Sequence, residues 1–187
     1  MRAAFIIFDN LTTLDFVGVY DGLTRLKTMD FDPEFSWEIC AVSKEVHDDK
    51  GLRMLPTRVG GSLEEFDMVV APGGFGSRPL LKDEAFLAWL RTAAHCKFKA
   101  SVCTGSLLFG AAGFLTGRRA TTHPNAYDAL RPYCAEVVRQ RIVDEGDLVT
   151  AGGVTSGIDL GLFLCEKFAG AEAKAAIKKQ MDYPYGD

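Results

Sequence analysis

Residues 99–113, KASVCTGSLLFGAAG, decide how the fold of this chain is interpreted. Lys99–Val102 is predicted to be a short strand, and Thr104–Ala112 has a helical pattern that closes at Gly113. Cys103 stands between them, so the sequence predicts a tight strand-to-helix turn with a cysteine at its tip. Such a turn pushes its side chain out at the top of the sheet, as in a nucleophile elbow, although that motif's first glycine is missing.

Strand and helix signals alternate along the rest of the chain. Ala3–Phe8 is a continuous apolar run, as in a buried parallel strand, and Phe35–Val42 alternates as a strand does. We also predict strands at Met68–Ala71, Arg141–Val143 and Leu148–Thr150, helices at Leu14–Leu26, Asp83–Ala94, Gly157–Phe168 and Ala171–Met181, a hairpin turn at Asp144–Asp147, and a capping-box-like pair of Ser156 and Asp159. This alternation predicts an α/β fold with a mostly parallel sheet.

Length and composition set limits on the function. The chain has 187 residues, of which 48% are hydrophobic, and this predicts one domain over residues 1–187. The net charge is -4 and basic runs are missing, which argues against nucleic-acid binding. The apolar runs are shorter than the ~20 residues that cross a bilayer, and no signal cleavage site is apparent. We therefore expect a cytoplasmic protein.

Cys103 is the candidate nucleophile among five cysteines. Backbone N–H groups and the helix dipole at the start of the following helix are expected to lower its pKa, and the thiolate is the reactive form. The rival interpretation is a buried cysteine that fills a gap. Cys40 and Cys165 lie within apolar patterns and are assigned to packing, whereas Cys96 and Cys134 have no nearby base. None of the five forms a C-x-x-C pair, and no metal-ligand spacing is present.

Other side chains could assist the cysteine. The N–H groups of Gly73 and Gly74, which follow a strand, could stabilise an oxyanion together with that of Thr104, although an ordinary turn is an equal alternative. A proton shuttle could come from His123 or from Asp15, an acid in apolar surroundings. The residues alone favour Asp15 as a helix N-cap or first-turn acid.

Four segments together resemble the ThiJ/PfpI superfamily, a group similar to class I glutamine amidotransferases that contains intracellular proteases and deglycases. They are Val70–Gly74, Ser101–Ser106, Arg119–His123 and Thr150–Asp159, and the likeness covers nearly the whole chain. Within the superfamily, Leu14-Asp15 and Cys103–Ser106 are most similar to isocyanide hydratase and to the amidase-like domains of AraC-type regulators. The resemblance implies a flavodoxin-like three-layer sandwich and a homodimer.

The resemblance also implies roles for the site residues. Cys103 matches the nucleophile and Asp15 the acid close to the thiol. The N–H groups of Thr104 and Gly74 would face the reacting carbon, and His123 matches a position near the site, with Gly73 as a further accessory residue. Because Thr104 stands where the protease branch carries histidine, peptidase activity is not expected.

The expected function is hydration of a small electrophile without a cofactor, by best match an isocyanide hydrated to an N-formamide. One alternative is a glyoxalase, deglycase or amidase acting on small molecules. Another is a non-catalytic sensor whose Cys103 is oxidised to sulfinic acid. Substrate-pocket residues are expected from the loops Phe75–Arg78 and Asn125–Tyr127 and from across the dimer interface.

Overall fold

The computed structural model describes residues 1–185 and contains one seven-stranded sheet. Its order is β10-β11-β7-β6-β1-β2-β5. The strands are β1 (Arg2–Ile6), β2 (Ser36–Ala41), β5 (Arg58–Val59), β6 (Met68–Ala71), β7 (Phe98–Val102), β10 (Ile142–Asp144) and β11 (Leu148–Ala151). β10 and β11 pair antiparallel, and every other neighbouring pair is parallel. The predicted mostly parallel α/β fold is confirmed.

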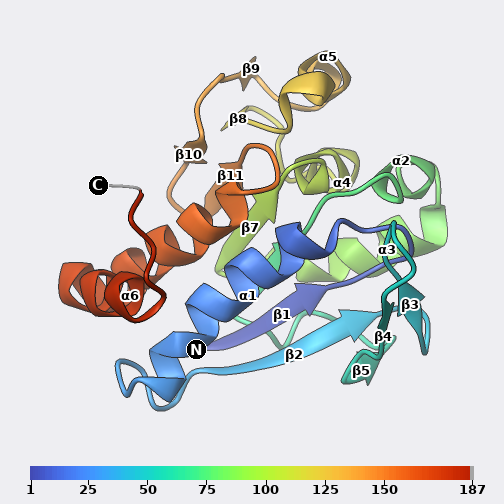
Figure 1. Cartoon of the computed structure of the whole chain (residues 1–187). Helices are drawn as coiled ribbons and strands as arrows, with labels where there is room; N and C mark the ends of the chain where they lie inside the picture. The colour runs from blue at the N-terminus through green and yellow to red at the C-terminus, as the bar shows by residue number, and fades with distance from the viewer. Residues whose placement is uncertain (186–187) are drawn as a thin grey trace.

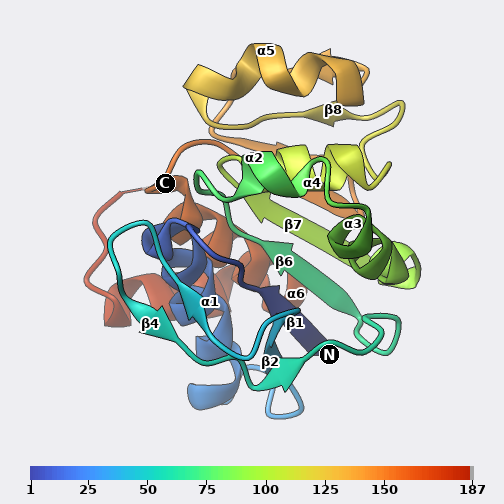
Figure 2. The ribbon, with the colours of Figure 1, turned by 90° about the vertical axis from the view of Figure 1, so that its right-hand side faces the viewer.

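Helices cover both faces of the sheet and complete the three layers. The helices α1 (Thr13–Thr28) and α6 (Ser156–Gln180) lie on one face, and α3 (Glu84–Arg91) and α4 (Gly105–Ala111) lie on the other (Figures 1 and 2). Glycines let α1 and α6 approach closely: a Cβ added to Gly18 would lie 3.0 Å from the backbone of Gly157. This contact places the start of α6 beside the first turn of α1.

Short elements fill the connections, and neither they nor the two-residue strand β5 were predicted from the sequence. They are β3 (Val46–His47), β4 (Arg53–Met54), α2 (Ser77–Leu80), β8 (Arg119–Ala120), α5 (Tyr127–Leu130), β9 (Glu136–Val137) and the 3₁₀ turns Thr92–His95, Pro124–Ala126 and Arg131–Tyr133. Segments of two to four residues are too short to show a hydrophobic period, which explains why the sequence did not reveal them. In the part of the chain that the structure describes, no helix is long and apolar enough to span a membrane.

The C-terminal part of the fold confirms one prediction and corrects another. Gly170 breaks α6 with φ 88°, so the two predicted helices on either side of it are both present. The capping box is wrong: Thr155 is the N-cap residue, and its side chain makes no cap hydrogen bond. Asp159 is instead engaged by the hydroxyl of Tyr183, at 2.9 Å, and by an ion pair with Arg141. The ion pair with Arg141 is a stronger interaction than a hydrogen bond to a backbone N–H at the start of the helix, so the Asp159 carboxylate does not serve as a cap.

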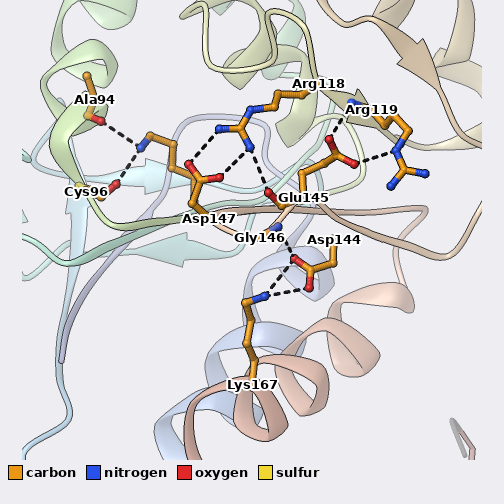
Figure 3. A network of polar contacts seen from close by, with 10 residues as sticks. Ala94, Cys96, Arg118, Arg119, Asp144, Glu145, Gly146, Asp147 and Lys167 are labelled. Carbon is orange, nitrogen blue, oxygen red and sulfur yellow. Dashed lines mark hydrogen bonds and ion pairs between the residues drawn. The ribbon is translucent and has the colours of Figure 1, made fainter.

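The predicted β10–β11 hairpin is present. Its turn forms ion pairs with the segment that begins at Arg118 and continues to His123. Asp147, in the turn, pairs with Arg118 at 2.7 Å, and Glu145 pairs with Arg119 at 2.8 Å (Figure 3). Asp144 holds Lys167 of α6 at 2.8 Å, which ties the turn to the helix layer. The two arginines begin the stretch that runs through β8 to His123. The network therefore fixes where this stretch starts.

Candidate active site

Cys103 occupies the predicted turn between β7 and α4. Its φ is 54°, a left-handed conformation that is unfavourable for any residue with a Cβ. The backbone around it is held on both sides: the Cys103 N–H donates to the carbonyl of Gly152 at 2.8 Å, and its own carbonyl accepts from Thr122 Oγ1 at 2.8 Å. Ser106 Oγ also donates to that carbonyl, at 3.1 Å. These bonds stabilise a strained turn, as at many functional sites.

Asp15 lies in the first turn of α1 and is fully buried. Its Oδ2 accepts the N–H of Gly73 at 3.0 Å, while its Oδ1 has no hydrogen-bond partner among residues 1–185. Burial raises the pKa of Asp15 to about 7, against the lowering effects of the Cys103 thiol and the Gly73 N–H. The carboxyl lies close to Cys103, because a Cβ added to Gly73 would be 2.8 Å from both Asp15 Oδ2 and Cys103 Cβ. With this pKa the carboxyl can gain or lose a proton near neutral pH.

The expected acidification of Cys103 is wrong for the free protein. Burial, together with the negative charge of Asp15, raises the pKa of the Cys103 thiol to about 12, and the lowering effect of the Thr104 N–H is smaller. Burial alone does not mark a reactive thiol, since it also raises the pKa of Cys165 to about 12. What distinguishes Cys103 is its carboxyl neighbour. Protonation of Asp15 removes the charge that opposes thiolate formation, so the two groups titrate as a pair.

The two glycines after β6 do not present the free N–H groups that the sequence suggested. Gly73 donates to Asp15, and the Gly74 N–H donates to Thr104 Oγ1 at 3.0 Å. The Thr104 hydroxyl donates in turn to the Gly74 carbonyl at 3.1 Å and lies 3.0 Å from Ser77 Oγ. The Thr104 N–H, by contrast, lowers the pKa of the Cys103 thiol through a hydrogen bond to its sulfur. The glycine loop thus positions the carboxyl and locks the turn.

A pocket of about 460 Å³ opens above Cys103. It is lined by Thr12, Asp49, Lys50, Gly74, Phe75, Arg78, Cys103, Thr104, His123, Asn125 and Val154. Phe75, Arg78 and Asn125 come from the two loops that the sequence analysis named. Thr12, Asp49 and Lys50 were missed, because they belong to connections whose place at the pocket depends on tertiary packing alone.

His123 reaches the pocket from the stretch after β8. Its Nδ1 accepts the N–H of Asn125 at 3.1 Å, so the neutral ring carries its proton on Nε2. The ring packs against Gly153, where an added Cβ would lie 2.7 Å from His123 Cδ2. The structure therefore brings Cys103, Gly74, Thr104 and His123 to one cavity, with Gly73 and Asp15 directly behind its floor. Within residues 1–185 no group of three or more His, Cys, Asp and Glu side chains could hold a metal ion.

The class of protein defined by this fold and site is a flavodoxin-like α/β protein with a cysteine on the turn after a central strand. Comparison with known proteins gives the family: residues 1–167 match the DJ-1/PfpI family. The chain is 36% identical over 184 residues to an isonitrile hydratase from Pseudomonas putida, which covers 98% of this chain and 78% of that protein. It belongs to the DJ-1/PfpI family, as its motifs indicated.

Solved structures agree with this assignment. A THiJ/PfpI family protein from Pseudomonas syringae superimposes with a TM-score of 0.89 at 29% identity, covering 100% of this chain and 76% of that one. An AraC family transcriptional regulator from Pseudomonas putida shares the fold, with a TM-score of 0.81 at 21% identity and coverage of 96% and 98%. Matches to several further relatives, such as Protein DJ-1alpha of Drosophila melanogaster, span 66% of the relative's length or less.

Proposed function

We propose that this protein hydrates small isocyanides to N-formamides, with Cys103 as the nucleophile and Asp15 as the proton carrier. One observation carries the proposal: the buried carboxyl of Asp15 lies beside Cys103, since a Cβ added to Gly73 would be 2.8 Å from both Asp15 Oδ2 and Cys103 Cβ, and Cys103 lines the pocket. The identity of 36% to an isonitrile hydratase over nearly the whole chain supports the choice of substrate.

The first step joins sulfur to carbon. Asp15 takes the proton of the Cys103 thiol, and the sulfur bonds to the terminal carbon of the isocyanide. The electron pair on that carbon then receives the proton from Asp15, which gives a thioimidate, R–N=CH–S–Cys103. Because burial raises the pKa of Asp15 to about 7, this carboxyl can both accept and return a proton near neutral pH.

Water completes the reaction. Its oxygen adds to the thioimidate carbon, and one of its protons goes to the substrate nitrogen. The carbon–sulfur bond then breaks, the remaining hydroxyl proton returns through Asp15 to the sulfur, and R–NH–CHO leaves. The sum is one isocyanide and one water consumed for one formamide, with no oxidation or reduction. The reaction therefore needs no external oxidant or reductant.

Neighbouring groups support these steps from fixed positions. The Thr104 N–H, which lowers the pKa of Cys103, stabilises negative charge on the sulfur as the carbon–sulfur bond forms and breaks. Gly73 orients the carboxyl, and Gly74 acts as a positioning residue through Thr104. His123, which also lines the pocket, offers an Nε2–H donor to the bound molecule.

The test is an assay panel with the purified protein, in which a neutral isocyanide and methylglyoxal are supplied separately and products are identified by mass spectrometry. We expect N-formamide from the isocyanide. Cys103→Ala should abolish it, and Asp15→Asn should lower its rate about 100-fold or more while the thiol still reacts with iodoacetamide. Cys165→Ala is the matched control, because Cys165 is buried in α6, away from the pocket, and should keep full rate.

Two results would overturn the proposal. One is turnover of methylglyoxal with no formamide from any isocyanide, which would favour the glyoxalase alternative. The other is formamide production that survives Cys103→Ala. If neither substrate reacts but dilute peroxide selectively oxidises Cys103, the sensor alternative replaces the enzyme.

The organisation of the protein in solution is part of the same proposal. We propose that residues 1–187 act as a single domain, that two copies form a homodimer and that the protein works in the cytoplasm, as in the family it resembles. Sedimentation velocity at several concentrations tests the dimer: a species of twice the 20.4 kDa chain mass is expected, and a monomer at all concentrations would contradict it.

A further inference from the structure

Arg78, on α2, differs from most arginines of the protein. Within residues 1–185, nine of the eleven arginines form an ion pair with a carboxylate. The two without such a pair are Arg78 and Arg139, and each lies over an aromatic ring, Phe75 and Tyr127 respectively. Of these two, Arg78 alone lines the pocket above Cys103.

The other charges at the pocket neutralise one another. Lys50 forms an ion pair with Asp49, its neighbour in the chain, and both line the cavity. Asp15 is fully buried and does not line the cavity. Arg78 is therefore the pocket's one uncompensated cation among the described residues. An anionic ligand would supply the missing partner.

The position of Arg78 keeps its hydrogen-bond donors available. Its guanidinium carbon lies 4.9 Å from the centre of the Phe75 ring, and that ring is 70% exposed at the pocket wall. A guanidinium over an aromatic face is held in place while its N–H groups remain free for a planar, bidentate acceptor. A carboxylate is such an acceptor.

We propose that the site selects small electrophiles that carry a carboxylate, which Arg78 binds at the pocket wall while Cys103 attacks the electrophilic carbon. The cavity of about 460 Å³ admits only a small molecule, so both groups would belong to one compact ligand. This inference deepens the proposed hydration by naming its substrate class, an isocyano-carboxylate. It rests on that proposal only for the isocyanide group.

The first test does not require turnover. The rates at which iodoacetate and iodoacetamide alkylate Cys103 are measured by mass spectrometry, and their ratio is compared between variants. Both reagents attack the same sulfur, so any change in its pKa cancels in the ratio. We expect Arg78→Gln to lower the iodoacetate-to-iodoacetamide ratio about fivefold, as for one ion pair at a pocket mouth, and Arg78→Lys to retain part of it.

Arg139→Gln is the matched control. Arg139 is likewise exposed, lies over an aromatic ring and has no carboxylate partner in the described part of the chain, but it does not line the pocket. Its loss changes the net charge by the same amount and should leave the ratio unchanged. An equal fall in both variants would mean that only the overall charge matters, and the inference would fail.

The second test uses turnover. Isocyanoacetate and its methyl ester differ in charge but share the isocyanide, and KM should favour the acid in the wild type but not in Arg78→Gln. Suppose that formamide forms, but that Arg78→Gln changes neither the iodoacetate-to-iodoacetamide rate ratio nor the ratio of KM between acid and ester. The carboxylate inference then fails and the hydratase proposal stands. If no isocyanide reacts but the alkylation ratio falls only in Arg78→Gln, the hydratase proposal fails and carboxylate recognition stands.

Discussion

The backbone N–H of Gly73 donates a 3.0 Å hydrogen bond to Oδ2 of Asp15, 58 positions away in the chain. The bond holds a fully buried carboxyl in one orientation, with Oδ1 left without a partner in the described residues. A single N–H does not replace the hydration that the carboxylate loses, so burial dominates and the pKa of Asp15 rises to about 7. The cost of this arrangement is measurable as a dependence of stability on pH.

Asp15→Asn should change how stability depends on pH. The folded wild type binds the Asp15 proton more tightly than the unfolded chain, whose carboxyl has a pKa of 3.8. The stability that Asp15 contributes is therefore present below about pH 4 and is lost as the pH rises through 7. Asparagine does not titrate, so the free energy of unfolding of the variant does not fall in this way as the pH rises. Urea unfolding at pH 4 and pH 8 should show the variant gaining up to about 4 kcal/mol on the wild type between the two.

Asp67→Asn is the control, because the pKa of Asp67 is lowered in the folded protein whereas that of Asp15 is raised. A backbone hydrogen bond from Arg2 and the side chain of Lys97 lower the pKa of Asp67. Its contribution is present at neutral pH and is lost as the pH falls through that lowered pKa, so the variant should be less stable than wild type at pH 7. A pH-independent difference between wild type and Asp15→Asn would show that Asp15 has an ordinary pKa.

Gly73→Ala should disrupt the site from within. An added Cβ would lie 2.5 Å from the Thr104 nitrogen and 2.8 Å from both Asp15 Oδ2 and Cys103 Cβ. The neighbours must move, and we expect a loss of about 1–3 kcal/mol in urea unfolding together with a fall in the alkylation rate of Cys103.

Gly152→Ala, directly after β11, is the matched substitution at the end of another parallel strand. Its nearest contact would be Ser156 Oγ at 3.5 Å, an ordinary van der Waals distance. Stability should stay within about 0.5 kcal/mol of wild type. If both alanine variants behave alike, close packing around Gly73 does not explain why glycine stands there.

The sequence predicted the main helices and every strand of the sheet except β5, because their apolar patterns are long enough to recognise. Ala3–Phe8 and Met68–Ala71 were recognised as buried strands, and the break at Gly170 was placed correctly between two helices. The local pattern also located Cys103 on its turn. Asp15 was different: its residues alone favoured a first-turn acid, which it is, and only the family resemblance suggested a place near the thiol.

The parts that the sequence did not predict depend on contacts between distant segments. The pKa of Cys103 was expected to fall because of the helix terminus, but burial and Asp15 outweigh that effect. The Gly74 N–H was expected to be free, but Thr104 Oγ1, 30 positions later, accepts it. Neither the depth of burial of a turn nor the partner of a single N–H leaves a local signature in sequence.

Thr104→Val should test the hydrogen bond between the Gly74 N–H and Thr104 Oγ1. Valine has nearly the shape of threonine but lacks the hydroxyl, so the Gly74 N–H would remain buried without an acceptor. We expect a loss of about 1–3 kcal/mol in urea unfolding. Ser77 retains an acceptor in the Gly74 carbonyl at 2.8 Å, which confines the effect to one group. Thr104→Ser keeps the hydroxyl and should recover most of the stability; equal losses in both variants would point to packing instead.

The strained backbone at Cys103 predicts that glycine will be more stable than alanine at this position, the reverse of the usual order within a helix. At φ 54°, a residue with a Cβ costs roughly 1–2 kcal/mol, which glycine avoids at an entropic cost of about 0.5–1 kcal/mol. Cys103→Gly should therefore be more stable than Cys103→Ala by about 0.5–1 kcal/mol. Both variants lack the sulfur, so the thiol and its pairing with Asp15 cancel in the comparison.

Cys165 provides the same pair of substitutions in ordinary geometry. It is buried in α6, where glycine is about 1 kcal/mol less favourable than alanine. Urea unfolding of the four variants should thus give opposite signs at the two positions: glycine favoured at Cys103 and alanine at Cys165. Alanine favoured at both would mean that the turn relaxes without strain. The hydrogen bonds from Thr122 and Ser106 to the Cys103 carbonyl would then be ordinary packing contacts, with no distorted turn to hold.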